Sequence, residues 1–96
     1  MTIYVIGYDL HPTSGETEKD YANLMSAIKA IAGGDWWHCL DSTWLVPSNQ
    51  TAVQIRDQLL PHIHRDDQLL VVAYAPHESA WYGFSGDCQT WLRSHM

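Results

Sequence analysis

The strongest constraint on this chain is the order in which strand-like and helix-like hydrophobic patterns follow one another. Residues 3–8 read IYVIGY and residues 68–75 read QLLVVAYA, and both runs are rich in the β-branched and aromatic residues typical of buried strands. Between them, two segments with apolar residues at helical spacing flank a pair of short strand-like runs. This order, β-α-β-β-α-β, predicts a ferredoxin-like α+β plait with two helices on one face of an antiparallel sheet.

Capping residues mark the boundaries of both helical segments. The first helix is predicted to begin at Thr17 or Glu18, and Gly33-Gly34 favours the left-handed backbone that ends helices. Thr51, with a glutamine three positions later, has the spacing of a capping box and predicts the start of the second helix. Pro61 lacks an amide hydrogen, so this helix is expected to end just before it.

Residues 34–46 read GDWWHCLDSTWLV and hold three tryptophans in a predicted hairpin. The two strands are expected at residues 36–40 and 42–46, with Asp41 as the turn residue. Pro47 is expected to end the second strand.

Side-chain alternation along these strands decides where the tryptophans point. Trp36 and His38 share one face of their strand, whereas Trp37 and Cys39 share the other. One face of the sheet is expected to pack under the helices and the other to be bare. Tryptophans on a bare face indicate a core combined with a partner interface, and stacking of nucleic-acid bases is the alternative. The predicted interface residues are Trp36, Trp44, Trp81, Tyr82 and Phe84.

The C-terminal extension, residues 77–96, carries two further predicted elements. Residues 79–84 read SAWYGF and predict a short extra strand. Asp87 is expected to cap a final helical turn or two that carries Cys88 and Leu92.

The chain has 96 residues, enough for a single domain, and its formal net charge of −6 restricts its partners. It has only five lysines and arginines, and no two are adjacent, so a monomer is a poor general binder of duplex nucleic acid. No run is long enough to span a membrane, and Met1 leads into the first strand without a basic leader, so a cytoplasmic location is expected. Cys39 and Cys88 lack CxxC spacing and are expected to be reduced thiols.

Several short motifs together resemble a known family. YVIGYDL (residues 4–10), STWLV (42–46) and DDQLLVVAYA (66–75) are similar to the small CRISPR-associated adaptation protein, the non-integrase subunit of the spacer-acquisition complex. The segments GYDL, WWHCLDSTWLV and IRDQL resemble still more closely the short bacterial and phage proteins labelled SinR family. The resemblance covers residues 3–75 and rests mainly on the topology.

This resemblance implies a ferredoxin-like homodimer in which an edge strand, here residues 79–84, adds to the partner's sheet. It also implies a nucleic-acid-related function, either metal-dependent phosphodiester cleavage, as in the CRISPR endoribonucleases, or a non-cleaving relative of such an enzyme.

In that family the aspartate at the end of the first strand lies near the dimer axis, where two copies can hold a divalent metal. The role carries over to Asp9, with Mg²⁺ or Mn²⁺ as the metal. Tyr8 and Ser42 are the other candidate catalytic residues. Residues 14–20, SGETEKD, are acidic, which departs from the basic pattern of family members that bind duplex DNA.

Other interpretations remain open. Asp9 is alternatively a cap for the loop that follows it. His38 is expected to be half-buried and bonded to the backbone, rather than an acid–base partner of Asp41 or Asp9. The whole chain is alternatively a non-catalytic acidic interaction module for a basic protein partner, as in phage defence, counter-defence or toxin–antitoxin pairs. A small-ligand sensor is the third possibility.

Overall fold

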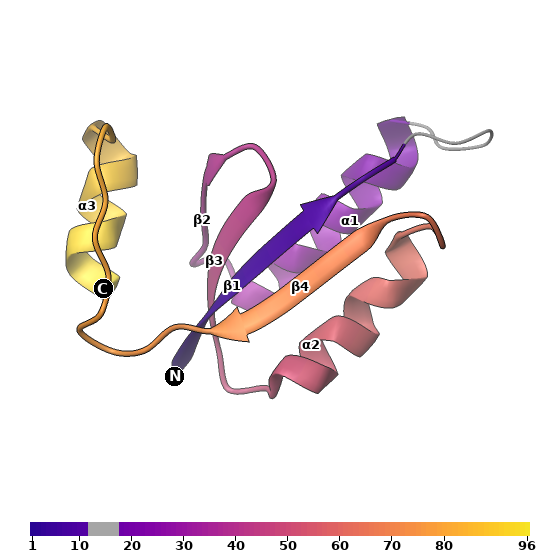
Figure 1. Cartoon of the computed structure of the whole chain (residues 1–96), viewed down its shortest axis with the longest axis horizontal. Helices are drawn as coiled ribbons and strands as arrows, with labels where there is room; N and C mark the ends of the chain where they lie inside the picture. Colours follow the sequence, from indigo (N-terminus) through magenta and orange to yellow (C-terminus); the bar gives the residue numbers. More distant parts are fainter. Residues whose placement is uncertain (12–17) are drawn as a thin grey trace.

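The computed structural model describes residues 1–11 and 18–96, with a mixed α+β arrangement of four strands and three α-helices (Figure 1). The predicted order β-α-β-β-α-β is confirmed, and a third helix follows it. Among the described helices, none has the length and apolar content needed to cross a membrane. The strands are β1 (Thr2–Asp9), β2 (Trp37–Leu40), β3 (Thr43–Ser48) and β4 (Gln68–Ala73). The helices are α1 (Glu18–Ala32), α2 (Ala52–Leu59), the short 3₁₀ helix η1 (Leu60–His62) and α3 (Gly86–His95).

The sheet is antiparallel throughout, in the order β2-β3-β1-β4. β1 is central, and its residue Val5 lies opposite Leu45 of β3 on one side and Val72 of β4 on the other. β2 and β4 are therefore the two edge strands, and the end of β1 at Asp9 lies beside the start of β4 at Gln68.

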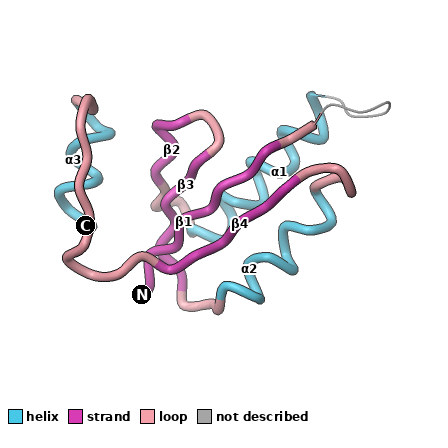
Figure 2. Tube along the Cα trace, viewed as in Figure 1, coloured by secondary structure: helices cyan, strands magenta, loops and turns pink. Residues whose placement is uncertain are grey.

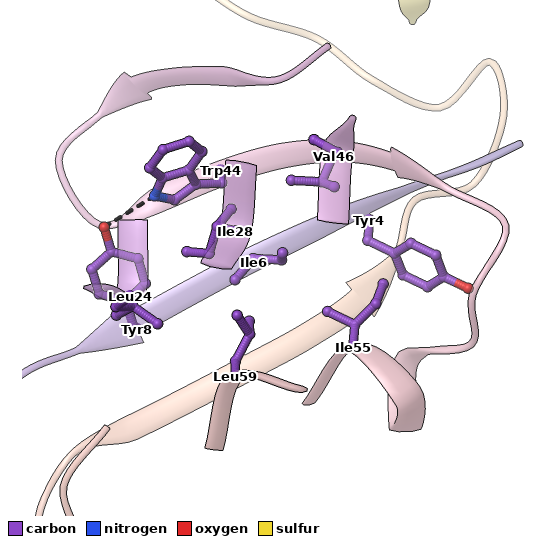
Figure 3. Close-up of a cluster of buried hydrophobic side chains, with 10 residues drawn as sticks. Tyr4, Ile6, Tyr8, Leu24, Ile28, Trp44, Val46, Ile55 and Leu59 are labelled. Carbon is purple, nitrogen blue, oxygen red and sulfur yellow. Dashed lines mark hydrogen bonds between the residues drawn. The ribbon is translucent and has the colours of Figure 1, made fainter. Parts of the chain in front are cut away.

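Helices α1 and α2 cover one face of this sheet and enclose the main core (Figure 2). Alternate residues of β1 point into the core, where Trp44 and Val46 of β3 meet them (Figure 3). Leucines and isoleucines on one side of each helix complete the packing, as their spacing predicted. The buried members of this core are Tyr4, Ile6, Tyr8, Leu24, Ile28, Ala32, Trp44, Val46, Ile55 and Leu59.

The helix ends follow the predicted capping signals. Gly33 has φ 64° and Gly34 has φ 92°, the left-handed backbone that glycine adopts without a steric penalty. At the start of α2, the Thr51 hydroxyl accepts from the amide of Gln54, and the Gln54 side chain accepts from the amide of Thr51. The predicted capping box is confirmed, and Pro61 lies just beyond α2 in η1.

β3 runs two residues further than predicted, because Pro47 does not end it. Pro47 pairs with Ile3 of β1, and Ser48 pairs with Thr2. On the other side of β3, the pairing with β2 reaches only from Thr43 to Leu45. Pro47 therefore lies past the end of β2, where no neighbouring strand needs its missing amide hydrogen.

The extra strand predicted at residues 79–84 is wrong. The chain from residue 74 to residue 85 has no strand, and α3 begins at Gly86. His77 has φ 66° and Gly83 has φ 90°, and both values interrupt the extended backbone that a strand requires. The predicted final turn or two is instead a helix of 10 residues.

The face of the sheet opposite α1 and α2 is partly covered, and not bare as expected. α3 lies at the β2 side of this face (Figure 1), where Leu92 packs in a second apolar cluster with Ile3, Trp37 and Leu45. Trp37 and Cys39 pack in this second cluster, whereas Trp36 packs against the main core, so the predicted alternation of Trp36 and Trp37 is confirmed.

The two cysteines form a disulfide that joins α3 to the sheet, so the expectation of reduced thiols is wrong. Cys39 lies on β2 and Cys88 lies near the start of α3. Beside them, the indole nitrogen of Trp37 donates to the carbonyl of Cys88 at 3.0 Å. Because Cys39 and Trp37 share a strand face, both links hold the same turn of α3.

Substitution of neighbouring leucines tests this placement of the core. Leu59 is fully buried and Leu60 is 46% exposed. We expect Leu59→Ala to lower the free energy of unfolding by about 2–5 kcal/mol, because it leaves a cavity between α2 and the sheet. Leu60→Ala, the matched control, should cost less than about 1 kcal/mol. Urea unfolding followed by tryptophan fluorescence measures both, and equal costs would contradict this core.

Candidate functional site

A cavity open to solvent lies where β1 ends and the β2–β3 hairpin turns. Its volume is about 410 Å³. All three candidate catalytic residues, Tyr8, Asp9 and Ser42, line it. The lining residues are Tyr8, Asp9, Leu10, Tyr21, His38, Asp41 and Ser42.

Tyr8 forms the buried wall of this cavity, and its hydroxyl is engaged within the protein. The hydroxyl accepts a hydrogen bond from the indole nitrogen of Trp44 at 3.1 Å (Figure 3). It also lies 3.3 Å from the carbonyl oxygen of Asp41 and 3.6 Å from the sulfur of Met25, which are acceptors. Burial raises the pKa of Tyr8 far above its ordinary value. Tyr8 therefore stays neutral at physiological pH and holds the hairpin against β1.

His38 is held in the cavity wall by its own hairpin. Its Nδ1 lies 3.0 Å from the carbonyl oxygen of Thr43, to which it donates a hydrogen bond. The imidazole stacks on the indole of Trp44, with ring centroids 3.9 Å apart and planes 8° apart. The expectation of a half-buried histidine bonded to the backbone is confirmed.

Asp9 stands at the rim of the cavity beside a histidine. Its Oδ2 lies 3.4 Å from Nε2 of His11, and the two side chains are 74% and 50% exposed. The same nitrogen of His11 lies 2.8 Å from the amide oxygen of Gln68. Asp9 and His11 thus form a solvent-facing pair at the end of β1. The loop that Asp9 was alternatively expected to cap falls partly on residues 12–17, outside the described residues.

His11 is the site residue that sequence reasoning missed. It looks isolated in the sequence, but β1 and β4 pair so that Asp9 lies opposite Gln68. The backbone amide of His11 also donates to the carboxylate of Asp67 at 2.8 Å. The Asp-x-His spacing at the end of a predicted strand was the only signal, and the pairing with β4 gives it meaning.

One chain supplies few ligands for a metal. Within residues 1–11 and 18–96, no group of three or more histidines, cysteines, aspartates or glutamates gathers in a way that could hold a metal ion. Asp9 and His11 offer one carboxylate and one imidazole, whereas Mg²⁺ prefers an octahedral shell of oxygens and often keeps several waters. Further oxygen ligands from water, from a bound substrate or from a carboxylate of another copy would complete such a shell at Asp9.

The residues predicted to form an interface lie in different environments. Trp44 is 1% exposed and packs in the main core, which leaves no surface for a partner. Trp36 is half-buried against it, with ring centroids 5.2 Å apart, and Phe84 is half-buried against the second cluster. Trp81 is 36% exposed and Tyr82 is 96% exposed, so both are accessible.

Two large apolar side chains of the edge strand β4 are exposed. Leu70 is 60% exposed and Val72 is 41% exposed. They lie opposite Gly7 and Val5 of β1, on the sheet face that α3 covers near β2 but not near β4. We call these four residues, Val5, Gly7, Leu70 and Val72, the open strip. It borders the free edge of β4, which pairs only with β1 in the described part of the chain (Figure 1).

A polar cluster fastens the C-terminal part of α3 to the segment before β2. The carboxylate of Asp35 accepts from the indole nitrogen of Trp91 at 2.8 Å, and its other oxygen lies 2.8 Å from Nε2 of His95. The rings of Trp91 and His95 stack at 3.8 Å. The hydrogen bond with His95 is the main cause that lowers the pKa of Asp35, against the opposing effect of partial burial.

Comparisons with known proteins give no relative. No protein-family model, no curated protein and no solved structure matches this chain. The cavity, the Asp9–His11 pair and the open strip are therefore the features of this chain that bear on its function.

Removal of the imidazole tests the Asp35 cluster. His95→Ala removes the main cause of the lowered pKa, so the pKa of Asp35 should rise toward its ordinary value. A lowered folded-state pKa stabilises the fold above the unfolded-state pKa of aspartate, and this stabilisation is lost as pH falls through the folded-state pKa. Below the ordinary aspartate pKa of 3.8, the stability advantage of the unmodified chain over His95→Ala should therefore shrink as pH falls.

An NMR titration of the Asp35 carboxyl carbon measures this shift. His77→Ala is the control, because His77 lies in the exposed segment after β4. An Asp35 pKa that stays unchanged in His95→Ala would contradict the assignment.

Proposed function

We propose that this chain is a ferredoxin-like protein-interaction module that associates with a second copy of itself through the open strip and the free edge of β4. The observation that carries the proposal is the 60% exposure of Leu70 and the 41% exposure of Val72 on an edge strand. Exposed apolar edge strands are templates for further strand pairing. The sheet order β2-β3-β1-β4, with α1 and α2 on one face, supports the ferredoxin-like assignment.

Charge favours a second copy at this surface. The chain carries a net charge of −6, so most pairings of its surface with itself bring like charges together. The open strip consists of uncharged residues, and there this repulsion is weakest. An antiparallel pairing of β4 with its copy obeys a two-fold axis and joins the two open strips on one face of a continuous sheet.

A charge placed in the open strip tests the pairing. Leu70→Lys should shift sedimentation from dimer to monomer, because two copies would bring the added charges into an apolar contact. Val53→Lys is the matched control, since Val53 is 55% exposed on α2, on the other side of the sheet. Analytical ultracentrifugation over a concentration series gives the dissociation constants. A monomer at every concentration for the unmodified chain would overturn the proposal and favour a basic protein partner instead.

A second candidate function is metal-dependent phosphodiester cleavage, as the resemblance to the CRISPR-associated adaptation and SinR-family proteins implies. One observation favours it: a single cavity brings Tyr8, Asp9 and Ser42 together, with His11 beside Asp9. In this function Asp9 would hold Mg²⁺ or Mn²⁺ together with a carboxylate of a second copy, and the metal would activate water. Tyr8 would act only by positioning, because its hydroxyl stays neutral and is bonded to Trp44. The net charge of −6 disfavours tight binding of nucleic acid.

Asp9→Asn tests the second candidate, because it keeps the shape of the side chain and removes the charge. If the chain cleaves labelled single- or double-stranded DNA or RNA with Mn²⁺ or Mg²⁺, the variant should lose that cleavage by about 100-fold or more. Asp57→Asn is the control, since Asp57 pairs with Arg56 at 2.9 Å on α2. Cleavage that persists in Asp9→Asn, or the absence of metal-dependent cleavage by the unmodified chain, would exclude this function.

The predicted cytoplasmic location bears on the disulfide. Reducing compartments keep most thiols reduced, and disulfides that occur there are usually transient, catalytic or redox-sensing. If this chain is cytoplasmic, the Cys39–Cys88 bond forms and breaks in its working life.

A further inference from the structure

α3 is attached to the rest of the protein by few contacts. It is 10 residues long, and Leu92 is its one buried residue. Isolated helices shorter than about 12–15 residues are marginal in water, so α3 depends on what anchors it. Its other noncovalent anchors include the packing of Trp91 in the second cluster, the bond from Trp37 to the Cys88 carbonyl, and the cluster around Asp35, whose side chain is 55% exposed.

The disulfide is the one covalent anchor, and it lies at the start of α3. Cys39 and Cys88 are 49 positions apart in the sequence, so the bond closes a long loop. Closing a long loop strongly restricts the conformations that the chain can adopt when α3 leaves the sheet. Cleavage of the bond restores that conformational entropy and so favours release of α3. Both cysteines are half-buried, so neither is sealed inside the main core.

Beneath α3 lies the apolar continuation of the open strip. Ile3 is 7% exposed, Trp37 is 4% exposed and Leu45 is 8% exposed, and all three pack with Leu92. Leu45 lies directly opposite Val5, a member of the open strip. The apolar face is thus continuous across β3, β1 and β4, and α3 covers the part nearer to β2.

We infer that α3 is a redox-released cover of the sheet, and that reduction of Cys39–Cys88 by a dithiol enlarges the surface available for self-association. The inference rests on the proposed function, since it names the regulation of the same open strip. In the oxidised chain α3 covers the part of the face nearer to β2. In the reduced chain a second copy competes with α3 for that part.

The chemistry is two successive thiol–disulfide exchanges. A thiolate of the dithiol attacks one sulfur of the Cys39–Cys88 bond, the bond breaks, and the other cysteine leaves as a thiolate that takes up a proton. The second thiolate of the dithiol then attacks the dithiol's own sulfur in the mixed disulfide and displaces the protein cysteine, which leaves as a thiolate and takes up a proton. The products are two cysteine thiols and the oxidised, disulfide form of the dithiol, so the electrons balance.

Hydrogen exchange and sedimentation of the full chain, with and without dithiothreitol, test the two halves of this inference. On reduction, the amides of residues 86–95 should exchange on the order of 100-fold faster, while those of β1 keep their protection. The dissociation constant of the dimer should fall by about tenfold or more. The double variant Cys39→Ser/Cys88→Ser should behave as the reduced chain without dithiothreitol, and protection of β1 shows that it is folded.

The outcomes separate this inference from the proposed function. Unchanged exchange at residues 86–95 on reduction would overturn the release of α3, whatever the oligomeric state. If exchange becomes faster on reduction but the dimer has the same dissociation constant in the oxidised and reduced states, the regulation is overturned and the self-association stands. Faster exchange with a monomer in both states would overturn the proposed function and with it the regulatory link. Leu70→Lys in the double variant should abolish the tightened association if the open strip is the shared surface.

Discussion

The hydrogen bond from the Trp44 indole to the Tyr8 hydroxyl, 3.1 Å long, is the point at which the parts of this fold meet. Trp44 lies on β3 and is 1% exposed, and Tyr8 lies on the central strand β1. His38 of β2 stacks on the same indole. A buried indole nitrogen without an acceptor is costly, so this pair fixes how the hairpin sits against β1. Because the Tyr8 hydroxyl is engaged in this hydrogen bond, Asp9 is the more accessible candidate catalytic residue at the rim of the cavity.

Two surfaces with different chemistry result from this arrangement. The cavity end gathers carboxylates, hydroxyls and imidazoles, among them Asp9, His11 and Ser42. The sheet face beyond it is apolar, and its exposed part is the open strip. Because Asp9 continues the alternation that places Val5 and Gly7 on this face, association through the strip and chemistry at Asp9 are compatible with each other.

Local patterns predicted most of the fold, because hydrophobic period and capping residues act within a few positions of one another. The strands and helices of residues 3–75 and the capping box at Thr51 belong to this class. The strand end predicted at Pro47 was wrong, because β3 accommodates a proline past the end of β2, and where β2 ends is a property of the sheet. The pattern at residues 79–84 has strand-like composition, but no strand forms there, and Gly83 has a left-handed backbone.

The candidate site, like the fold, could be predicted from the sequence only in part. Tyr8, Asp9 and Ser42 could be picked out from residue type and motif, and one cavity unites them. His11 could not, since its partner Gln68 is brought to it by strand pairing. The Cys39–Cys88 bond was missed because it depends on where α3 packs against β2, which no local pattern in the sequence shows.

The disulfide also makes part of the backbone a closed ring. The ring runs from Cys39 through β3, α2 and β4 to Cys88, and it includes the exposed segment with Trp81 and Tyr82. If one peptide bond in that segment is cleaved, the ring opens, but the two fragments stay linked by the disulfide. The oxidised protein nicked in this exposed segment would keep α3 covalently attached, whereas the reduced protein nicked at the same bond would lose its C-terminal helix by diffusion.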